Sequence, residues 1–221
     1  MRVAILDSGV PPDLPVVARV AFALADGAVV EAPPHPDRVG HGSAVAAILH
    51  ALAPDAALLD AQIFADAPTC SAAVVAAGLR WAVGQGAGMA IMSFGLPADR
   101  AVLAAAVAEA RAAGLSLLAA CPARGGPVWP AAYPGVIAVT GDARCGVGEL
   151  SRLPGAYGAC PRPWGETADT SPRAGGASLA VGHLAGLLAR DGALESSPDA
   201  VAARLAPLVR WHGPERRVAA G

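Results

Sequence analysis

The chain of 221 residues contains no asparagine and no lysine, and all 16 of its basic residues are arginine. Its formal net charge of −2 lacks the basic surplus that nucleic-acid-binding domains carry. Although 54% of the residues are hydrophobic, no uninterrupted apolar stretch reaches the ~18 residues that a membrane-spanning helix needs. We therefore expect a globular chain with neither nucleic-acid nor membrane partners.

Metal-binding and export patterns are also missing. The four cysteines (Cys70, Cys121, Cys145 and Cys160) show no CxxC or Cys/His ligand spacing. The opening "MRVAILDSGV" is typical of a buried strand and leaves no room for the charged and apolar regions of a signal peptide. These features predict reduced thiols, no metal, no cofactor and a cytoplasmic location.

Short apolar runs alternate with helical segments along the chain. Strands are predicted over 3–7, 57–64, 88–95, 115–121 and 135–142. Helices are predicted over 43–52, 71–86, 98–114, 178–192 and 197–211. This alternation predicts an α/β fold with a parallel sheet covered on both faces. No repeat and no long linker divides the chain, so we expect one domain over 1–221.

In such folds, ligands bind beyond the carboxyl ends of the strands. The first predicted strand ends at Asp7, which Ser8 and Gly9 follow. An aspartyl phosphatase would need a second aspartate at position 9, and a ribose-binding acid would need a glycine-rich phosphate turn before it. Asp7 is therefore either an orienting carboxylate or a structural cap.

Two further segments carry candidate side chains. In "GHGSAVAAIL" (40–49), glycines flank His41, although glycine costs a helix about 1 kcal/mol relative to alanine. We expect these glycines to let a substrate backbone pass close to His41. In "GGASLAVGHLAG" (175–186), Ser178 opens the most apolar predicted helix. Taken alone, Ser178 is more typical of a helix cap than of a nucleophile.

The order Asp7, His41, Ser178 is the order of the catalytic triad in subtilisin. "ILDSGV", "GHGSAVAAIL" and "GGASLAVGHLAG" resemble the aspartate, histidine and serine motifs of the subtilases. "GLRWAVGQGAGMAIMSFG" and "AAYPGVIAVTG" resemble segments that lie between those motifs in the family. The resemblance extends from Val3 to about Trp211. It implies a subtilisin-like three-layer α/β sandwich with a mainly parallel central sheet, reduced in size.

The resemblance also implies roles for the three residues. Asp7 would fix the tautomer of His41, which would take the proton of Ser178 as that hydroxyl attacks a scissile carbonyl. The edge formed by Ser93, Phe94 and Gly95 would bind a peptide or protein substrate as an added strand.

Four other histidines have no expected role in catalysis. His183 lies five positions after Ser178, about 140° around a helix, and we expect it in the core. His35, His50 and His212 are expected in loops or at the surface, with no metal implied.

One departure from the family affects catalysis directly. Subtilases stabilise the oxyanion with an asparagine side chain, and Pro122 or Ala123 occupies the corresponding position here. Loss of one such donor typically costs about 10²- to 10³-fold in turnover. Arg124 or the backbone N–H groups of 123–126 are the candidate substitutes. Cys121, next to this region, is expected to be a small buried hydrophobe.

The chain passes from the helix after His41 to the next strand without a calcium-binding loop, so no structural calcium is expected.

The sequence leads to two hypotheses about function, from different classes. In size and plan the chain is similar to the small subtilases that remove leader peptides, in particular during maturation of quinohemoprotein amine dehydrogenase. The first hypothesis is therefore a selective serine endopeptidase for one dedicated substrate, in a complex with peptide-modifying enzymes. The alternative is a pseudoprotease that binds peptides as a scaffold or chaperone.

Overall fold

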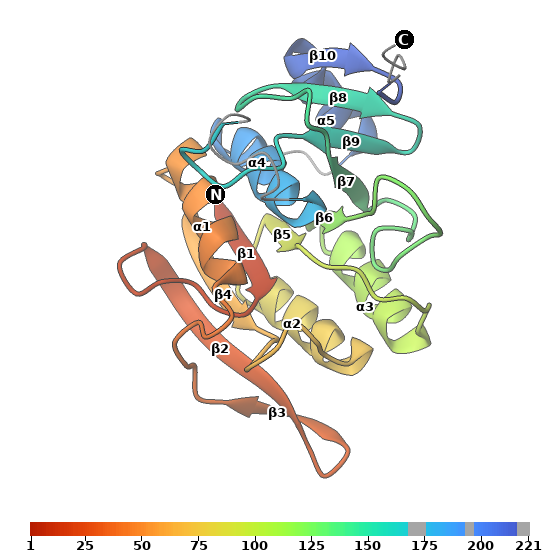
Figure 1. Ribbon diagram of the computed structural model, residues 1–221. Helices are drawn as coiled ribbons and strands as arrows, with labels where there is room; N and C mark the ends of the chain where they lie inside the picture. Colours follow the sequence, from red (N-terminus) through yellow and green to blue (C-terminus); the bar gives the residue numbers. More distant parts are fainter. Residues whose placement is uncertain (168–175, 193–196, 216–221) are drawn as a thin grey trace.

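The computed structural model describes residues 1–167, 176–192 and 197–215, and a ten-stranded sheet runs through this part of the molecule (Figure 1). The strands are β1 (Arg2–Asp7), β2 (Val16–Ala25), β3 (Ala28–Ala32), β4 (Ala57–Gln62), β5 (Met89–Met92), β6 (Ser116–Ala120), β7 (Ile137–Gly141), β8 (Leu150–Leu153), β9 (Ala156–Ala159) and β10 (Val209–His212). Their order in the sheet is β10-β8-β9-β7-β6-β5-β1-β4-β2-β3. The pairs β2–β3 and β8–β9 are antiparallel and the other neighbours are parallel.

Helices cover both faces of this sheet. They are α1 (His41–Leu52), α2 (Ala72–Gly84), α3 (Ala101–Ala112), α4 (Ala177–Ala189) and α5 (Pro198–Leu205), followed by the 3-10 turn η1 (Ala206–Leu208). One apolar core lies between the sheet and α1, α4 and α5, and a second lies between the sheet and α2 and α3. Among the described residues, no helix is long and apolar enough to cross a membrane. The predicted mainly parallel α/β sandwich is confirmed.

Close contact between α1 and α4 holds together the helices that carry His41 and Ser178. A Cβ atom added at Gly186 would lie 2.6 Å from the Cβ atom of Leu52, and one added at Gly182 would lie 3.2 Å from the carbonyl oxygen of Val45. The two glycines in α4 therefore allow the helix backbones to approach each other more closely than larger residues would.

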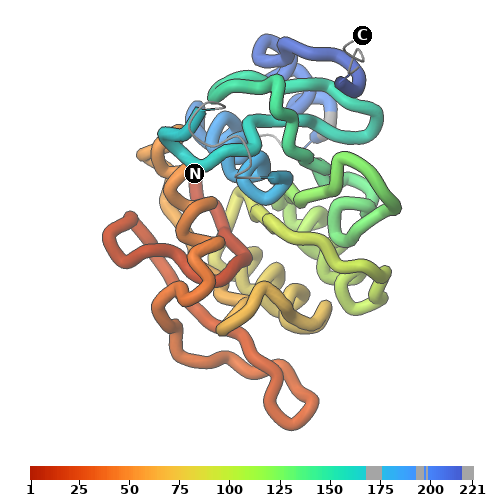
Figure 2. Tube along the Cα trace, in the orientation of Figure 1, coloured from red at the N-terminus to blue at the C-terminus, as the bar shows by residue number. Residues whose placement is uncertain are grey.

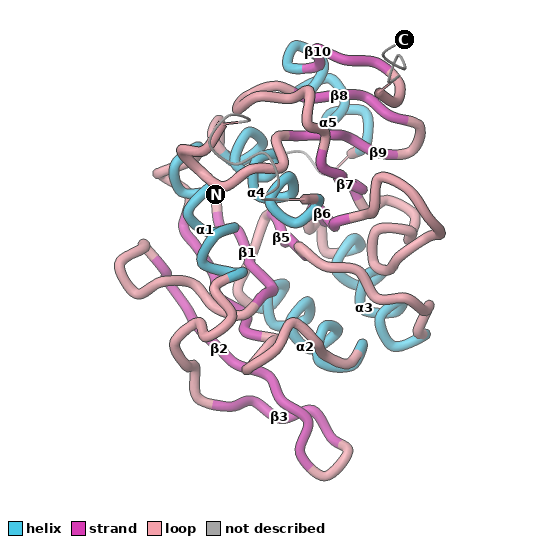
Figure 3. The backbone as a smooth tube through the Cα atoms, viewed as in Figure 1, coloured by secondary structure: helices cyan, strands magenta, loops and turns pink. Residues whose placement is uncertain are grey.

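The sheet extends at both ends beyond the predicted strands. The hairpin of β2 and β3 turns at Asp26 and Gly27, which both have positive φ, and it projects from the foot of the molecule (Figure 2). The pair β8–β9 turns at Pro154 and Gly155, and β10 joins β8 at the opposite end of the sheet (Figure 3). Asp-Gly and Pro-Gly are strong turn dipeptides. They were the sequence signals that would have predicted both hairpins.

The last helix is shorter than predicted. Ser197 caps α5 by accepting a hydrogen bond from the backbone N–H of Ala200, as the sequence suggests. The helix ends at Leu205, however, and the chain continues through η1 into β10. Pro207 explains the difference, because a proline cannot donate the backbone hydrogen bond that a longer helix would need.

Candidate active site

Asp7 and His41 form a direct pair at the carboxyl edge of the sheet. Asp7 is the last residue of β1 and 1% exposed, and His41 is the first residue of α1. The Nδ1 atom of His41 lies 2.8 Å from Oδ1 and 2.9 Å from Oδ2 of Asp7. Because a carboxylate accepts, Nδ1 carries the proton and the lone pair of a neutral ring lies on Nε2. This arrangement suits a general base.

Ser8 connects the buried carboxylate to α1. Its backbone N–H donates to Oδ1 of Asp7 at 2.8 Å and its hydroxyl donates to the same oxygen at 3.2 Å. The hydroxyl oxygen accepts in turn from the backbone N–H of Gly42 at 2.9 Å. Ser8 therefore holds the end of β1 and the first turn of α1 in one hydrogen-bonded unit.

The two glycines beside His41 differ in their surroundings. A Cβ atom on Gly42 would collide with the carbonyl oxygen of Gly9 and lie 2.8 Å from its nitrogen. Gly40 has φ of 79°, which favours glycine, and no atom would lie within 4 Å of its Cβ. The segment that lies close to Gly42 is thus the loop after β1, which contains Gly9.

Asp37 closes the N-terminus of α1, a role that sequence analysis missed. Its Oδ1 atom accepts from the backbone N–H groups of Val39 (3.0 Å) and Gly40 (2.8 Å). Its Oδ2 atom accepts from the backbone N–H (2.9 Å) and the hydroxyl (2.6 Å) of Ser43. Gly40 occupies the cap position without a side chain, and Asp37 supplies the missing acceptor from three residues upstream.

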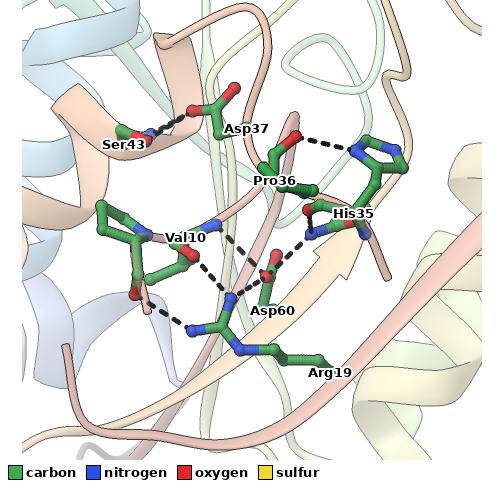
Figure 4. A network of polar contacts seen from close by, with 9 residues as sticks. Val10, Arg19, His35, Pro36, Asp37, Ser43 and Asp60 are labelled. Carbon is green, nitrogen blue, oxygen red and sulfur yellow. Dashed lines mark hydrogen bonds and ion pairs between the residues drawn. The ribbon is translucent and has the colours of Figure 1, made fainter. Parts of the chain in front are cut away.

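A buried network fastens the loop that carries Asp37 (Figure 4). Asp60 is fully buried in β4, and its Oδ2 atom accepts from Arg19 (3.0 Å), from the backbone N–H of Val10 (3.2 Å) and from Gln62 (3.1 Å). Gln62 also exchanges two hydrogen bonds of 2.9 Å with the backbone of His35. Burial raises the pKa of Asp60 despite these donors. The network ties β2, β4 and the loop after β1 to the loop before α1.

Two carboxylates influence the charge of His41. Its hydrogen bond to Asp7 raises the pKa of His41 above the ordinary value of 6.5, burial of the ring opposes this rise, and the negative charges of Asp7 and Asp37 add to it. Burial alone would raise the pKa of Asp37, but the hydrogen bonds from Ser43 and Gly40 hold that pKa below its ordinary value. Asp37 therefore stays ionised and favours the protonated form of His41.

Replacing Asp37 by asparagine is expected to lower the pKa of His41, because a negative charge that stabilises the imidazolium is removed. The variant should also lose about 0.5–2 kcal/mol of stability, since the amide cannot accept from Ser43 as the carboxylate does. NMR titration of the imidazole and urea unfolding measure these two effects. Asp55→Asn removes the same charge beyond the other end of α1 and is the control. Equal His41 pKa values in the two variants would contradict the proposed coupling.

Ser178 lies on the same edge of the sheet, in the first turn of α4. Its Oγ atom donates a hydrogen bond of 2.7 Å to the carbonyl oxygen of Ser93. Ser93 follows β5, and the parallel register of Ile5 with Ile91 brings it level with Asp7. In the described part of the chain, no hydrogen bond joins Ser178 to His41. The serine hydroxyl is thus near the expected edge, but it is engaged by a backbone carbonyl.

The predicted substrate edge is partly occupied by the chain itself. Ser93 is buried, Phe94 is half-buried and Gly95 is exposed. Leu96, the next residue, exchanges backbone hydrogen bonds with Trp129 in an antiparallel bridge. A Cβ atom added at Gly95 would lie 2.8 Å from the side chain of Val128. The assignment of residues 93–95 to substrate binding stays a prediction.

The region after β6 offers no side-chain substitute for asparagine that is held in place. Pro122, Ala123 and Arg124 are all exposed. Within the described residues, the Arg124 side chain forms no hydrogen bond or ion pair. Cys121 is half-buried, and burial raises the pKa of its thiol, so it is a thiol rather than a thiolate at neutral pH. The identity of the oxyanion donors stays a prediction.

Three of the other four histidines lie where the sequence predicts, but His50 does not, because it lies within α1 with its Nδ1 atom buried. His183 is 1% exposed and donates from Nε2 to the carbonyl oxygen of Arg162 at 2.8 Å, which confirms its place in the core. His35 lies in a loop and His212 is exposed, whereas His50 is half-buried in the last turn of α1. No cluster of three metal-ligating side chains occurs among the described residues.

Comparison with known proteins places this geometry in a family. Residues 1–153 match the model of the subtilase family of peptidases. The thermostable alkaline protease of Halalkalibacterium halodurans is 33% identical over 151 residues, which are 62% of this chain and 40% of that protein. Subtilisin Savinase of Lederbergia lenta is 31% identical over 152 residues, which are 63% of this chain and 54% of that protein. The aligned part thus spans about half or less of each relative.

Solved structures show the same fold at lower identity. Sphericase has a TM-score of 0.69 and 22% identity, and the match covers 92% of this chain and 81% of sphericase. A cold-adapted subtilisin-like serine proteinase has a TM-score of 0.65 and 19% identity, with 88% and 77% covered.

The family match ends at residue 153, before Ser178. The position of Ser178 therefore depends on the fold and on its own sequence motif, whereas Asp7 and His41 lie inside the matched segment. Since the family model covers more than half of the chain, the chain belongs to the subtilase family.

Proposed function

We propose that this protein is a serine endopeptidase in which Asp7, His41 and Ser178 form the catalytic triad. The observation that carries the proposal is the pairing of His41 Nδ1 with the buried Asp7 carboxylate at 2.8–2.9 Å, in a chain of the subtilase family. A buried carboxylate at this distance orients the ring and stabilises the imidazolium that forms when Nε2 accepts a proton.

The hydrogen bond from the Ser178 hydroxyl to the Ser93 carbonyl is the arrangement expected of this site when no substrate is bound. An extended peptide that pairs with residues 93–95 brings a backbone N–H to the Ser93 carbonyl, where it competes with the Ser178 hydroxyl. The released hydroxyl then turns to His41 Nε2. Its oxygen attacks the scissile carbonyl while its proton passes to His41, which gives the proton to the leaving amine. Water completes the cycle by hydrolysing the acyl-enzyme.

For the oxyanion, we propose backbone N–H groups as the donors. The N–H groups of residues 123–126 donate no hydrogen bond within the described part of the chain and lie in an exposed loop. The N–H of Ser178 in the first turn of α4 is a second donor of the same kind. A site without an asparagine side chain would be slow, which suits an enzyme with one dedicated substrate.

The substrate we propose is a peptide or protein that carries a leader segment, with the crosslinked small subunit of quinohemoprotein amine dehydrogenase as the first candidate. The absence of an asparagine donor from the chain, which favours a slow and selective enzyme, supports this choice. A complex with peptide-modifying enzymes and a cytoplasmic location belong to the same proposal.

Cleavage of the candidate substrate tests the function. Purified protein is incubated with the leader-bearing small subunit and, separately, with casein, and intact-mass analysis follows the products. We expect one cut at the leader junction, little cleavage of casein, and no cut by Ser178→Ala. Cleavage of casein at many sites would contradict the selectivity, and cleavage that persists in Ser178→Ala would contradict the triad.

A binding protein without catalysis is the second candidate. The hydroxyl of Ser178 is bonded to Ser93 rather than to His41, and the chain has no asparagine to hold an oxyanion. This candidate predicts that the leader-bearing subunit binds equally well to the wild type and to Ser178→Ala, and that neither protein cleaves it.

A further inference from the structure

We propose that the protein has a second binding site, for a small organic anion, at the edge of the sheet opposite Asp7 and Ser178. A pocket of about 490 Å³ opens there beside the amino ends of β6 and β7, the β8–β9 turn and the start of α5. Pockets of this size hold small molecules in other proteins. Because the strands in this part of the sheet are parallel, the pocket lies at the end remote from the candidate active site.

Two arginines line this pocket, and neither has a carboxylate partner among the residues that the structure describes. Arg111 lies in the last turn of α3 and forms no ion pair or hydrogen bond within the described residues. The guanidinium carbon of Arg152 lies 4.4 Å from the centre of the Tyr157 ring, and one of its nitrogens donates weakly to the carbonyl of Ala156. No acidic side chain is among the described residues that line the pocket. The site therefore has uncompensated positive charge.

The backbone at Gly135 leaves room for the side chain of Arg111. Gly135 has φ of 79°, and a Cβ atom at this position would collide with the guanidinium of Arg111. Only glycine leaves this space open, so Arg111 lies directly against the backbone at the pocket wall.

A buried hydroxyl points to a polar ligand as well. Ser116 lines the pocket, is 4% exposed, and its Oγ atom has no hydrogen-bond partner within the described structure. A buried polar atom without a partner is costly, and a ligand oxygen would satisfy it. Ser197, whose oxygen caps α5, also lines the pocket, and its hydroxyl donates no hydrogen bond within the described residues.

These features select a carboxylate or a phosphate group as the ligand chemistry. Each guanidinium presents a planar fork of donors that matches two oxygens of such an anion. The Ser116 hydroxyl, which has no partner within the described structure, would add a donor, and the Tyr157 ring stacks against the Arg152 guanidinium. The inference is independent of protease activity, since none of these residues belongs to the triad.

Calorimetric titration with citrate, adenosine 5′-monophosphate and inorganic phosphate at constant ionic strength tests this site. We expect at least one probe to bind with a Kd below about 1 mM, and its identity distinguishes a carboxylate from a phosphate ligand. Arg111→Gln and Arg152→Gln should each weaken binding by about tenfold or more. Gly135→Ala should weaken it too, because it displaces Arg111 without removing charge.

Arg100→Gln is the matched control, because it removes the same charge at the other end of α3. It should bind the probe within about twofold of the wild type, and so should Ser178→Ala. The proposal is overturned if none of the three probes binds at about 10 mM, or if Arg100→Gln loses as much affinity as Arg111→Gln and Arg152→Gln.

Discussion

Replacing Ser178 by alanine is expected to lower the rate of leader cleavage by about 10⁴-fold or more, while the protein stays folded. The triad acts as a unit, so removal of its nucleophile leaves only binding and backbone donors. Within the described residues, the hydroxyl forms one hydrogen bond, to the carbonyl of Ser93, and it does not cap α4. Its loss should therefore cost about 1 kcal/mol of stability or less. Single-turnover cleavage assays and urea unfolding measure the two quantities.

Ser71→Ala is the control for this variant. Ser71 also stands at the start of a helix, where its oxygen accepts from the backbone N–H of Val74 at 3.3 Å. Its replacement should cost about 1 kcal/mol of stability and leave the cleavage rate within a few-fold. If Ser178→Ala still cleaves at a tenth of the wild-type rate or faster, Ser178 is not the catalytic nucleophile.

Gly42→Ala is expected to have the largest effect on stability, about 3 kcal/mol. The added methyl group would collide with the carbonyl oxygen of Gly9 and lie 3.1 Å from the Cβ atom of Asp7. Gly9 itself is closely packed, because a Cβ atom there would lie 3.1 Å from Nε2 of Gln62 and 3.2 Å from Cβ of Asp37. The collision therefore pushes α1 from β1 and disturbs the pair of Asp7 and His41. A shift of about 1 Å there should lower activity by about 10²-fold.

Gly84→Ala provides the comparison, since Gly84 ends α2 and no atom would lie within 4 Å of its added Cβ atom. This control should change stability by about 1 kcal/mol or less in either direction. Urea unfolding of both variants measures the difference. Equal stability of Gly42→Ala and Gly84→Ala would contradict the close packing described between α1 and the loop after β1.

The central strands could be predicted because their sequence patterns are local. Strand β1 is a short apolar run that ends in Asp7, and its position at the carboxyl edge of a parallel sheet follows from the fold class. The proximity of Asp7 and His41 follows only from the resemblance to subtilases, because 34 positions separate them in sequence. The structure confirms that these two side chains are paired.

The supporting residues could not be predicted, because their roles depend on tertiary contacts. Asp37 caps α1 from outside the usual cap position, which Gly40 occupies. From the sequence alone, Asp60 is one polar residue in an apolar strand, and its ion pair with Arg19 becomes evident only in the folded structure. The close packing of Gly42 against Gly9 depends on the loop after β1, which its own sequence does not place. The extent of the domain, the oxyanion donors, the partners and the location in the cell stay predictions.

Labelling with a fluorophosphonate, followed by intact-mass analysis, tests most directly whether His41 activates Ser178. The reagent forms a covalent bond with a serine oxygen only when a neighbouring base makes that oxygen nucleophilic. We predict one adduct on the wild type and none on Ser178→Ala or His41→Ala. If the folded wild type gives no adduct, with and without the leader-bearing subunit, while a reference hydrolase reacts in parallel, then these three residues do not form a working triad.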